Sequence, residues 1–217
     1  MLQVVKNHFG RRPERNISLL ILNFTYVFIW GMTSGALEKY GFGIIYSLIF
    51  IFSARAIKEN KKWLFSLSAI SIVTFWLSFF LNLKMVMLVS HILSIIFFSM
   101  SIVLLAINLA KAKTISAVEF LEGINIYFLL GITGSLLLSL VFILHPEAFN
   151  AGYKLSIPAD LIYYSFVTLT SLGYGDITPA IPLTKSISIF LSFSGQIYIA
   201  MIISMLIGKY LNTKAKD

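Results

Sequence analysis

Long runs of apolar residues fill most of the sequence, and short polar or charged stretches separate them. A bilayer core about 30 Å thick needs roughly 20 mostly apolar residues for each spanning helix. Six runs approach or exceed this length, and they predict transmembrane helices at residues 17–32, 40–57, 63–83, 85–109, 123–144 and 183–210. A further apolar run, residues 159–170, is too short to span and predicts a surface helix or a re-entrant helix between the last two spans.

The composition agrees with a membrane protein. Of 217 residues, 58% are hydrophobic and 12% are charged, and this charged share is about half that of a soluble domain. A soluble enzyme and a nucleic-acid partner are therefore excluded, and membrane lipids are the expected surroundings. The absence of cysteine also excludes disulfides, iron–sulfur clusters and thiol nucleophiles. We expect an all-α integral membrane protein.

The positions of the basic residues predict the orientation. If the six helices alternate in direction, most Lys and Arg residues fall on one side, and the other side carries only Lys39, Lys84, Lys154 and Lys185. Because cytoplasmic loops are enriched in Lys and Arg, this split predicts that both termini lie in the cytoplasm. The plasma membrane is the expected location. Two alternatives remain. The basic start, the first apolar run and the small residues Ser34-Gly35-Ala36 could form a cleaved signal peptide, or the basic clusters could bind anionic lipid or a partner.

The segment T-L-T-S-L-G-Y-G-D, residues 168–176, directly follows the short apolar run. Gly173 and Gly175 flank one aromatic residue, and glycine accepts positive φ without steric cost. The backbone can therefore alternate between left-handed and right-handed conformations along this segment. Such a strand turns successive carbonyls to one side, and four strands around an axis form oxygen rings that replace the water around a cation. The negative end of the preceding helix dipole, near Thr168 and Thr170, favours a cation at the same place. An ordinary turn at residues 175–176 is the alternative.

This segment resembles the signature of tetrameric potassium channels, T-x-x-T-x-G-Y-G-D, which follows a pore helix and precedes a pore-lining helix. The resemblance is close over residues 159–176, and residues 123–210 fit the outer helix, pore helix, filter and inner helix of that family. It implies a homotetramer and passive conduction of K⁺ as the permeant ion, with no cofactor and no enzymatic activity.

Residue by residue, the resemblance assigns K⁺ coordination to the carbonyls of Ser171, Leu172, Gly173 and Tyr174, with the Ser171 hydroxyl completing the innermost site. The expected supports of the filter are Thr168, Thr170, Gly175, Asp176, and an aromatic cuff of Tyr163 and Tyr164. These two tyrosines could instead belong to an interfacial aromatic belt. Gly195 is a candidate gating hinge or a close-packing position. The candidate pore-lining residues are Ile199, Ile203 and Ile207.

Two departures from the family pattern leave the selectivity open. Many relatives have Thr where this chain has Ser171, and Val where it has Leu172. Both changes could loosen the filter, so a weakly selective monovalent cation channel is the alternative. A secondary transporter with a re-entrant loop is a more remote alternative. Transporters usually carry an ionisable residue near the middle of the membrane, and no Asp, Glu, Lys or Arg lies in the middle of a predicted span.

The expected domains are a cytoplasmic N-terminal segment (1–16), a four-helix bundle (17–109), a linker (110–122), a pore domain (123–210) and a tail (211–217). The fourth span, residues 85–108, contains no Arg or Lys. Because a voltage sensor needs several such charges, we expect a bundle that does not sense voltage. Glu119 and Glu122 are interpreted as part of a solvated linker, or as residues that couple the two halves. Gly131 and Gly134 are interpreted as packing positions.

Overall fold

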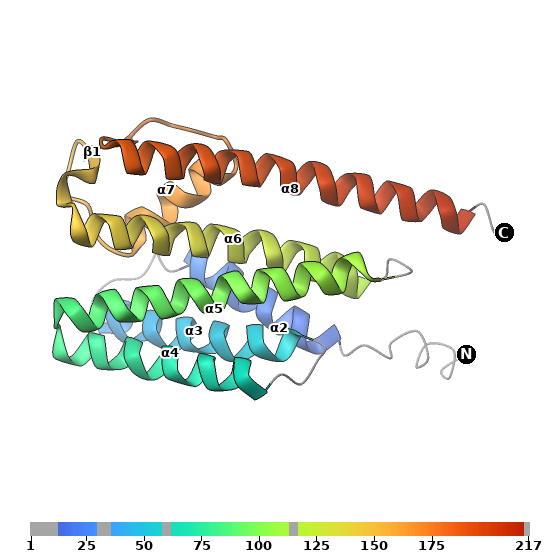
Figure 1. Cartoon of the computed structure of the whole chain (residues 1–217), viewed down its shortest axis with the longest axis horizontal. Helices are drawn as coiled ribbons and strands as arrows, with labels where there is room; N and C mark the ends of the chain where they lie inside the picture. The colour runs from blue at the N-terminus through green and yellow to red at the C-terminus, as the bar shows by residue number, and fades with distance from the viewer. Residues whose placement is uncertain (1–12, 30–35, 58–61, 113–116, 215–217) are drawn as a thin grey trace.

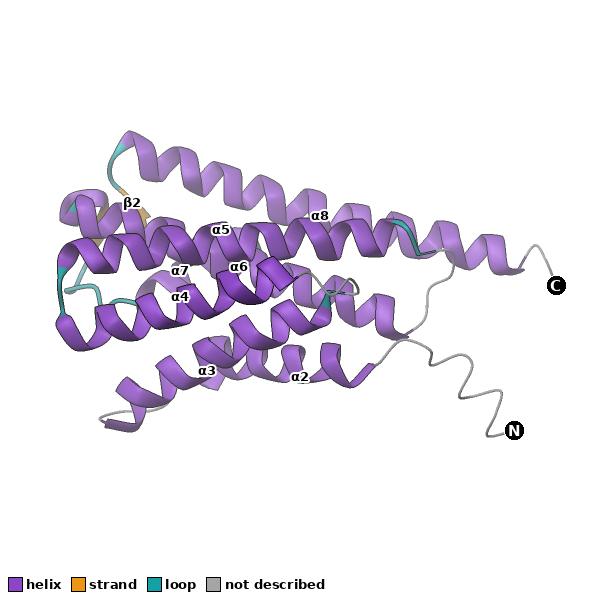
Figure 2. Cartoon of the chain, turned by 60° about the horizontal axis from the view of Figure 1, so that its bottom comes forward, coloured by secondary structure: helices purple, strands orange, loops and turns teal. Residues whose placement is uncertain are grey.

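The computed structural model describes residues 13–29, 36–57, 62–112 and 117–214 (Figure 1). Nearly all of these residues are helical, which confirms the expected all-α membrane fold (Figure 2). The helices are α2 (Pro13–Phe24) with its π-helical continuation η1 (Thr25–Ile29), α3 (Ala36–Ala56), α4 (Lys62–Leu81), α5 (Lys84–Ala110), α6 (Ala117–Leu144), the 3₁₀ turn η3 (Pro146–Ala148), α7 (Ala159–Leu169) and α8 (Pro182–Lys214). Two short strands, β1 (Phe149–Ala151) and β2 (Ile177–Pro179), pair antiparallel with Asn150 opposite Thr178.

Among the described residues, four helices are long and apolar enough to cross a membrane: α4, α5, α6 and α8. The chain is therefore a multi-pass membrane protein. The apolar part of α3 that can be assessed, Tyr40–Ala56, is shorter, and α2 with η1 spans 12 and 5 residues. The count of six spans stays a prediction.

An aromatic core holds α3 and α5 together with the first helix. Tyr26, Tyr46, Phe50, Phe97 and Phe98 are all buried in it. The Tyr46 and Phe50 ring centroids lie 5.0 Å apart, and those of Phe50 and Phe97 lie 4.7 Å apart. Tilted and edge-to-face aromatic pairs at such distances add to the packing energy of the helices. The same hydrophobic core continues into α6, so these helices and α6 pack together.

Helix α6 is the wall that joins this bundle to the rest of the chain. In Figure 1 it lies between α5 on one side and α7 and α8 on the other. Buried amides attach α2 to it: Asn23 Nδ2 donates to Asn125 Oδ1 at 3.2 Å, and Asn125 Nδ2 donates to the Asn16 carbonyl at 2.9 Å. Hydrogen bonds between helices are a common means of association where no water competes.

The start of α6 differs from the expectation. It begins at Ala117, so most of the predicted linker, 110–122, that the structure describes is helical. Glu119 and Glu122 are buried, and the interpretation of a solvated charged loop is therefore wrong. The reason is periodicity: Val118, Glu122 and Ile126 share the helix face that packs inward, so packing extends the helix past the acidic residues.

Other boundaries move less. Helix α8 runs to Lys214, beyond the expected end at residue 210 and into the predicted tail. Helix α2 begins at Pro13, inside the expected N-terminal segment, and the π-turn Thr25–Ile29 was not predicted. The Ser34-Gly35 site considered for signal cleavage, and the basic residues at positions 6, 11, 12, 58, 61, 113 and 216, lie outside the described residues.

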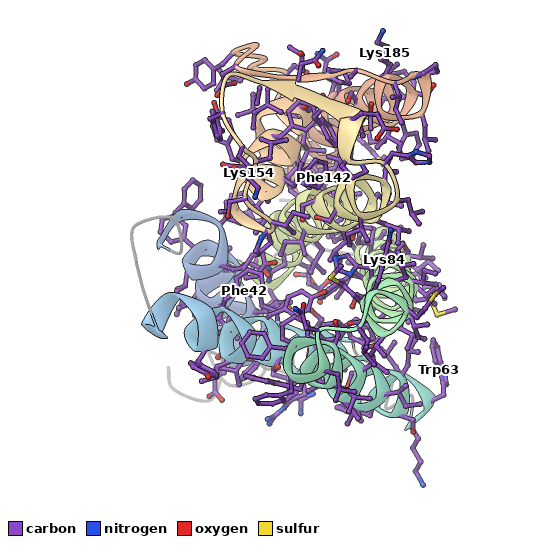
Figure 3. All side chains as sticks on the ribbon, turned by 90° about the vertical axis from the view of Figure 1, so that its left-hand side faces the viewer. Phe42, Trp63, Lys84, Phe142, Lys154 and Lys185 are labelled. Carbon is purple, nitrogen blue, oxygen red and sulfur yellow. The ribbon has the colours of Figure 1, made fainter. Side chains whose placement is uncertain are left out.

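The helix ends fall into two groups. The start of α2 and the end of α8 lie at one end of the molecule, and the β1–β2 ribbon and the α4–α5 turn lie at the other (Figure 1). Lys84, Lys154 and Lys185 gather at the ribbon end, which faces the viewer in Figure 3. Arg15, Arg55, Lys62 and Lys111 belong to helix ends on the opposite side. The described residues thus keep the charge asymmetry that the sequence predicts; which side is cytoplasmic stays a prediction.

Candidate functional site

The short helix α7 lies between α6 and α8, and two glycines on α6 make room for it (Figure 1). A Cβ at Gly131 would overlap the Phe166 ring, and one at Gly134 would lie 2.6 Å from Ser165 Oγ. The Ser165 hydroxyl donates to the Gly131 carbonyl at 2.7 Å. The interpretation of Gly131 and Gly134 as packing positions is therefore confirmed.

Directly beyond α7, the backbone alternates between left-handed and right-handed conformations. Ser171 has φ +58°, Gly173 has φ +57° and Gly175 has φ +81°, whereas Leu172 and Tyr174 between them do not have positive φ. The predicted alternation is present, and it starts at Ser171, two residues before the first glycine. A non-glycine residue in the left-handed region costs about 1–2 kcal/mol, so neighbouring contacts must hold Ser171 there.

Backbone hydrogen bonds join this loop to the end of α7. The Leu172 N–H donates to the Val167 carbonyl at 2.9 Å, and the Ser171 N–H donates to the Thr168 carbonyl at 3.0 Å. The last carbonyls of a helix lack partners within the helix, and here the loop supplies them. The negative end of the α7 dipole consequently lies next to Ser171.

The loop is uncovered within one chain. All residues from Thr170 to Asp176 are exposed, and the side chains of Leu172 and Tyr174 are 56% and 66% exposed. Non-helical backbone at membrane depth is tolerated only where protein buries it or where it borders water. The loop therefore requires either neighbouring protein or a water-filled path.

A hydrogen bond closes the outer end of the loop. Tyr163 Oη on α7 donates to Asp176 Oδ2 at 2.7 Å. This bond lowers the pKa of the Asp176 carboxyl below its ordinary value of 3.8, and it is the main reason that the pKa of Tyr163 is raised to about 12. Both groups keep the protonation states that the bond needs across the neutral range.

Residues 125–211 match the model of a protein family described as an ion channel. The match includes α7, the loop and all but the last residues of α8, and it covers less than half of the chain. It supports ion conduction as the activity of these residues, which we name the channel region. No curated protein and no solved structure matches the chain.

Within the channel region, α8 carries four polar residues that the sequence reasoning missed. Thr184, Ser188, Ser192 and Gln196 recur every four residues on a largely apolar helix, and we call them the polar stripe. This spacing places them on one helix face, which is the signal that could have identified them. Each side chain has a partner outside its own helix, as the distances below describe.

Along α8, from its start toward its middle, the residues of the polar stripe bind partners in different segments of the channel region. Thr184 Oγ1 donates to the Ala148 carbonyl at 2.9 Å, beside the ribbon. Ser188 Oγ lies 2.7 Å from the Tyr164 hydroxyl on α7. Ser192 Oγ lies 2.9 Å from Ser171 Oγ, and Gln196 Nε2 donates to Ser171 Oγ at 3.0 Å. The stripe thus connects α8 to the ribbon, to α7 and to the loop in turn.

The two tyrosines of the expected cuff have different surroundings in the channel region. Tyr164 is buried, with its ring 5.3 Å from that of Phe149 and its hydroxyl against Ser188. Tyr163 is partly exposed and bonded to Asp176. Both support the loop or the helix behind it within one subunit, and a complete cuff stays a prediction.

Gly195 is a contact point between α8 and α7. A Cβ at this position would overlap the backbone carbonyl of Leu169, the last residue of α7. This supports the close-packing interpretation, and the hinge stays a prediction. The candidate pore-lining residues Ile199, Ile203 and Ile207 are about half exposed, so the described residues leave this face of α8 largely uncovered.

Proposed function

We propose that the chain forms a homotetrameric, K⁺-selective channel that conducts passively across the plasma membrane, with both termini cytoplasmic. The observation that carries the proposal is the alternation of positive φ at Ser171, Gly173 and Gly175, next to the C-terminal end of α7. Alternating backbone directs successive carbonyls to one side, and a ring of such carbonyls replaces the hydration shell of a cation. The proposed ligands are the carbonyls from Ser171 to Tyr174 and the Ser171 hydroxyl.

A ring of ligands requires several chains, and the resemblance to tetrameric potassium channels suggests four of them. One chain supplies one strand, and a ring of carbonyls around an axis needs several copies related by rotation. The exposed loop and the half-exposed isoleucines of α8 are the surfaces that such copies would cover or leave facing a water-filled cavity. Gly175, Asp176, Tyr163 and the threonines Thr168 and Thr170 would support the filter from within the subunit.

The proposed channel has little intrinsic voltage dependence. Beyond Lys84 at its first position, α5 contains no Lys or Arg over its 27 residues. Moving one elementary charge through 100 mV supplies about 2.3 kcal/mol, and this helix has no row of charges to move. Conductance rising steeply with depolarisation in the absence of a blocking ion would contradict this part of the proposal.

Ion flux from liposomes tests the proposal. The purified full chain should release K⁺ down its gradient, pass much less Na⁺, and be blocked by Ba²⁺. The Gly173→Ala variant should lose most of the flux, because a Cβ in the left-handed region costs about 1–2 kcal/mol in every subunit. Gly152→Ala is the matched control: Gly152 lies in the loop before α7, has open space around it and does not need positive φ.

Each outcome decides between named alternatives. Equal K⁺ and Na⁺ flux, with little change in reversal potential when the two ions are exchanged, would favour a weakly selective monovalent cation channel. That alternative is motivated by Ser171 and Leu172, the two positions that differ from the family pattern. A monomeric particle or an absence of ion flux would sink the proposal.

A further inference from the structure

The hydroxyl of Ser171 is the proposed ion ligand with side-chain partners on another helix. It lies 3.0 Å from the Gln196 amide nitrogen and 2.9 Å from the Ser192 hydroxyl, both on α8. The following inference rests on the proposed function, because it concerns the strength of the innermost ring of ligands.

The number of lone pairs limits what this hydroxyl can bind. A serine hydroxyl has one hydrogen and two acceptor lone pairs. The Gln196 amide occupies one lone pair as a donor. If Ser171 donates its own hydrogen to Ser192, one lone pair remains for a cation; if Ser192 donates instead, none remains. The polar stripe therefore controls whether and how strongly Ser171 binds an ion.

The amide also acts through its charge. The NH₂ group of a glutamine carries partial positive charge, and here it lies against the same oxygen that would bind the ion. The Ser171 oxygen is next to the negative end of the α7 dipole, which strengthens cation binding at this ring. Conduction requires binding that is weak enough for the ion to leave. A donor behind the ligand oxygen weakens the ring.

We propose that Gln196 is a positioning residue that sets the cation affinity of the innermost ring, by donating a hydrogen bond to the Ser171 hydroxyl without touching the ion. Ser192 assists by accepting the Ser171 hydrogen and thereby leaving one lone pair of Ser171 free. The packing of Gly195 against the Leu169 carbonyl holds this part of α8 against the loop, so the donor stays in place.

The experiment measures Ba²⁺ block, applied from the side of the α8 C-terminus, on the full chain in planar bilayers. Gln196→Met keeps the length of the side chain and removes the donor, and it should tighten the block about tenfold, the change that 1.4 kcal/mol represents. Gln196→Glu, which replaces the donor with an acceptor, should tighten it further. Ser204→Ala is the control, because the Ser204 hydroxyl donates to the Ala200 carbonyl of its own helix, and it should leave the block unchanged.

A double-mutant cycle separates a hydrogen bond from a general effect on the cavity. In a Ser171→Ala background, Gln196→Met should no longer change the block, because the oxygen through which Gln196 acts is gone. An equal effect of Gln196→Met in both backgrounds would overturn the inference, and so would unchanged or weaker block in Gln196→Met.

The failure of this inference can be distinguished from failure of the proposed function. Wild-type protein that conducts K⁺, with block that Gln196→Met leaves unchanged, overturns only the role of Gln196. Wild-type protein without K⁺ flux overturns both. Size-exclusion profiles that match the wild type establish that each variant assembles; if Gln196→Met does not, Gln196→Leu, which also lacks the donor and adds no charge, carries the same cycle and must show the same loss of effect with Ser171→Ala.

Discussion

The two halves of this protein differ in how completely one chain covers them. In the N-terminal bundle, the rings of Phe50, Phe97 and Phe98 are fully buried by helices of the same chain. In the channel region, the side chains of Leu172, Tyr174 and Phe193 are more than half exposed, and the first two lie on irregular backbone. Lipid can cover the outer face of a helix, but it cannot satisfy the backbone of a loop. Lipid can therefore cover the exposed side chains of the bundle, whereas the loop of the channel region would be covered by the neighbouring copies of the proposed assembly.

Helix α6 is shared by the two halves, and the core of the bundle continues through its buried residues to Ile162 on α7. Its contact with α2 depends on buried amides, and its contact with α7 depends on glycines that allow close approach. Changes on the first side should alter stability, and changes on the second side should alter conduction. Substitutions at Gly195, Asn125 and Tyr163 test this division.

Gly195→Ala should have the largest effect. The new Cβ would overlap the Leu169 carbonyl, so α8 must move away from the end of α7. Overpacking of this kind costs about 1–3 kcal/mol, and here it acts in every subunit. We expect loss of most K⁺ flux in liposomes and a lower melting temperature.

Gly208→Ala on the same helix is the control for this change, since a Cβ there meets open space, and it should behave as the wild type. If Gly195→Ala conducts like the wild type, the close contact between α8 and α7 is not needed for conduction.

Asn125→Leu should have a moderate effect on stability and none on selectivity. It removes the hydrogen bonds that α6 makes with Asn23 and with the Asn16 carbonyl. Such bonds between membrane helices contribute about 1 kcal/mol each. We expect a melting temperature lower by a few degrees and an unchanged K⁺/Na⁺ reversal potential.

Asn108→Leu on α5 is the matched control, because the amide nitrogen of Asn108 is buried without a hydrogen-bond partner. It should be neutral or slightly stabilising. A selectivity change in Asn125→Leu would show that the bundle and the filter are not independent.

The smallest effect concerns pH at the outer end of the loop. The pKa of the Asp176 carboxyl is lowered from 3.8. The stability that its charged form gives to the loop is therefore present above pH 3.8 and is lost as the pH falls through the lowered pKa. The neutral phenol of Tyr163, whose pKa is raised from 10.0 to about 12, stabilises the loop fully below pH 10. This stabilisation is lost as the pH rises through about 12. K⁺ conductance should therefore be flat between about pH 5 and pH 9.

Tyr163→Phe should move the acidic limb of this pH profile upward, because Asp176 loses the donor that stabilises its charged form. The measurement is K⁺ conductance against the pH on the ribbon side. Tyr153→Phe serves as the control, since Tyr153 bonds to Asp160 and not to Asp176. An acidic limb that is identical in wild type and Tyr163→Phe would exclude a contribution of this bond.

The helical segments could be predicted because membrane helices are determined by local apolar length. The alternating backbone of the loop could be predicted for the same kind of reason: Gly173 and Gly175 accept positive φ wherever they occur. The assignment of Glu119 and Glu122 to a solvated loop was wrong, because both residues lie on a helix and are buried. A charged side chain does not by itself indicate exposure where its helix face continues into a packed interior. The periodicity from Val118 to Ile126 was the better signal.

Some features depend on where distant segments meet. The sequence by itself determined that the chain enters a membrane, that a short helix and a glycine-relieved strand interrupt its last part, and that the fourth span lacks charges. Only the tertiary structure decided that Gly195 meets the Leu169 carbonyl, that the amides of α2 and α6 pair, and that Gln196 donates to Ser171. Apolar length and backbone freedom belong to a segment alone, whereas a hydrogen bond between two helices requires a distance that neither helix specifies.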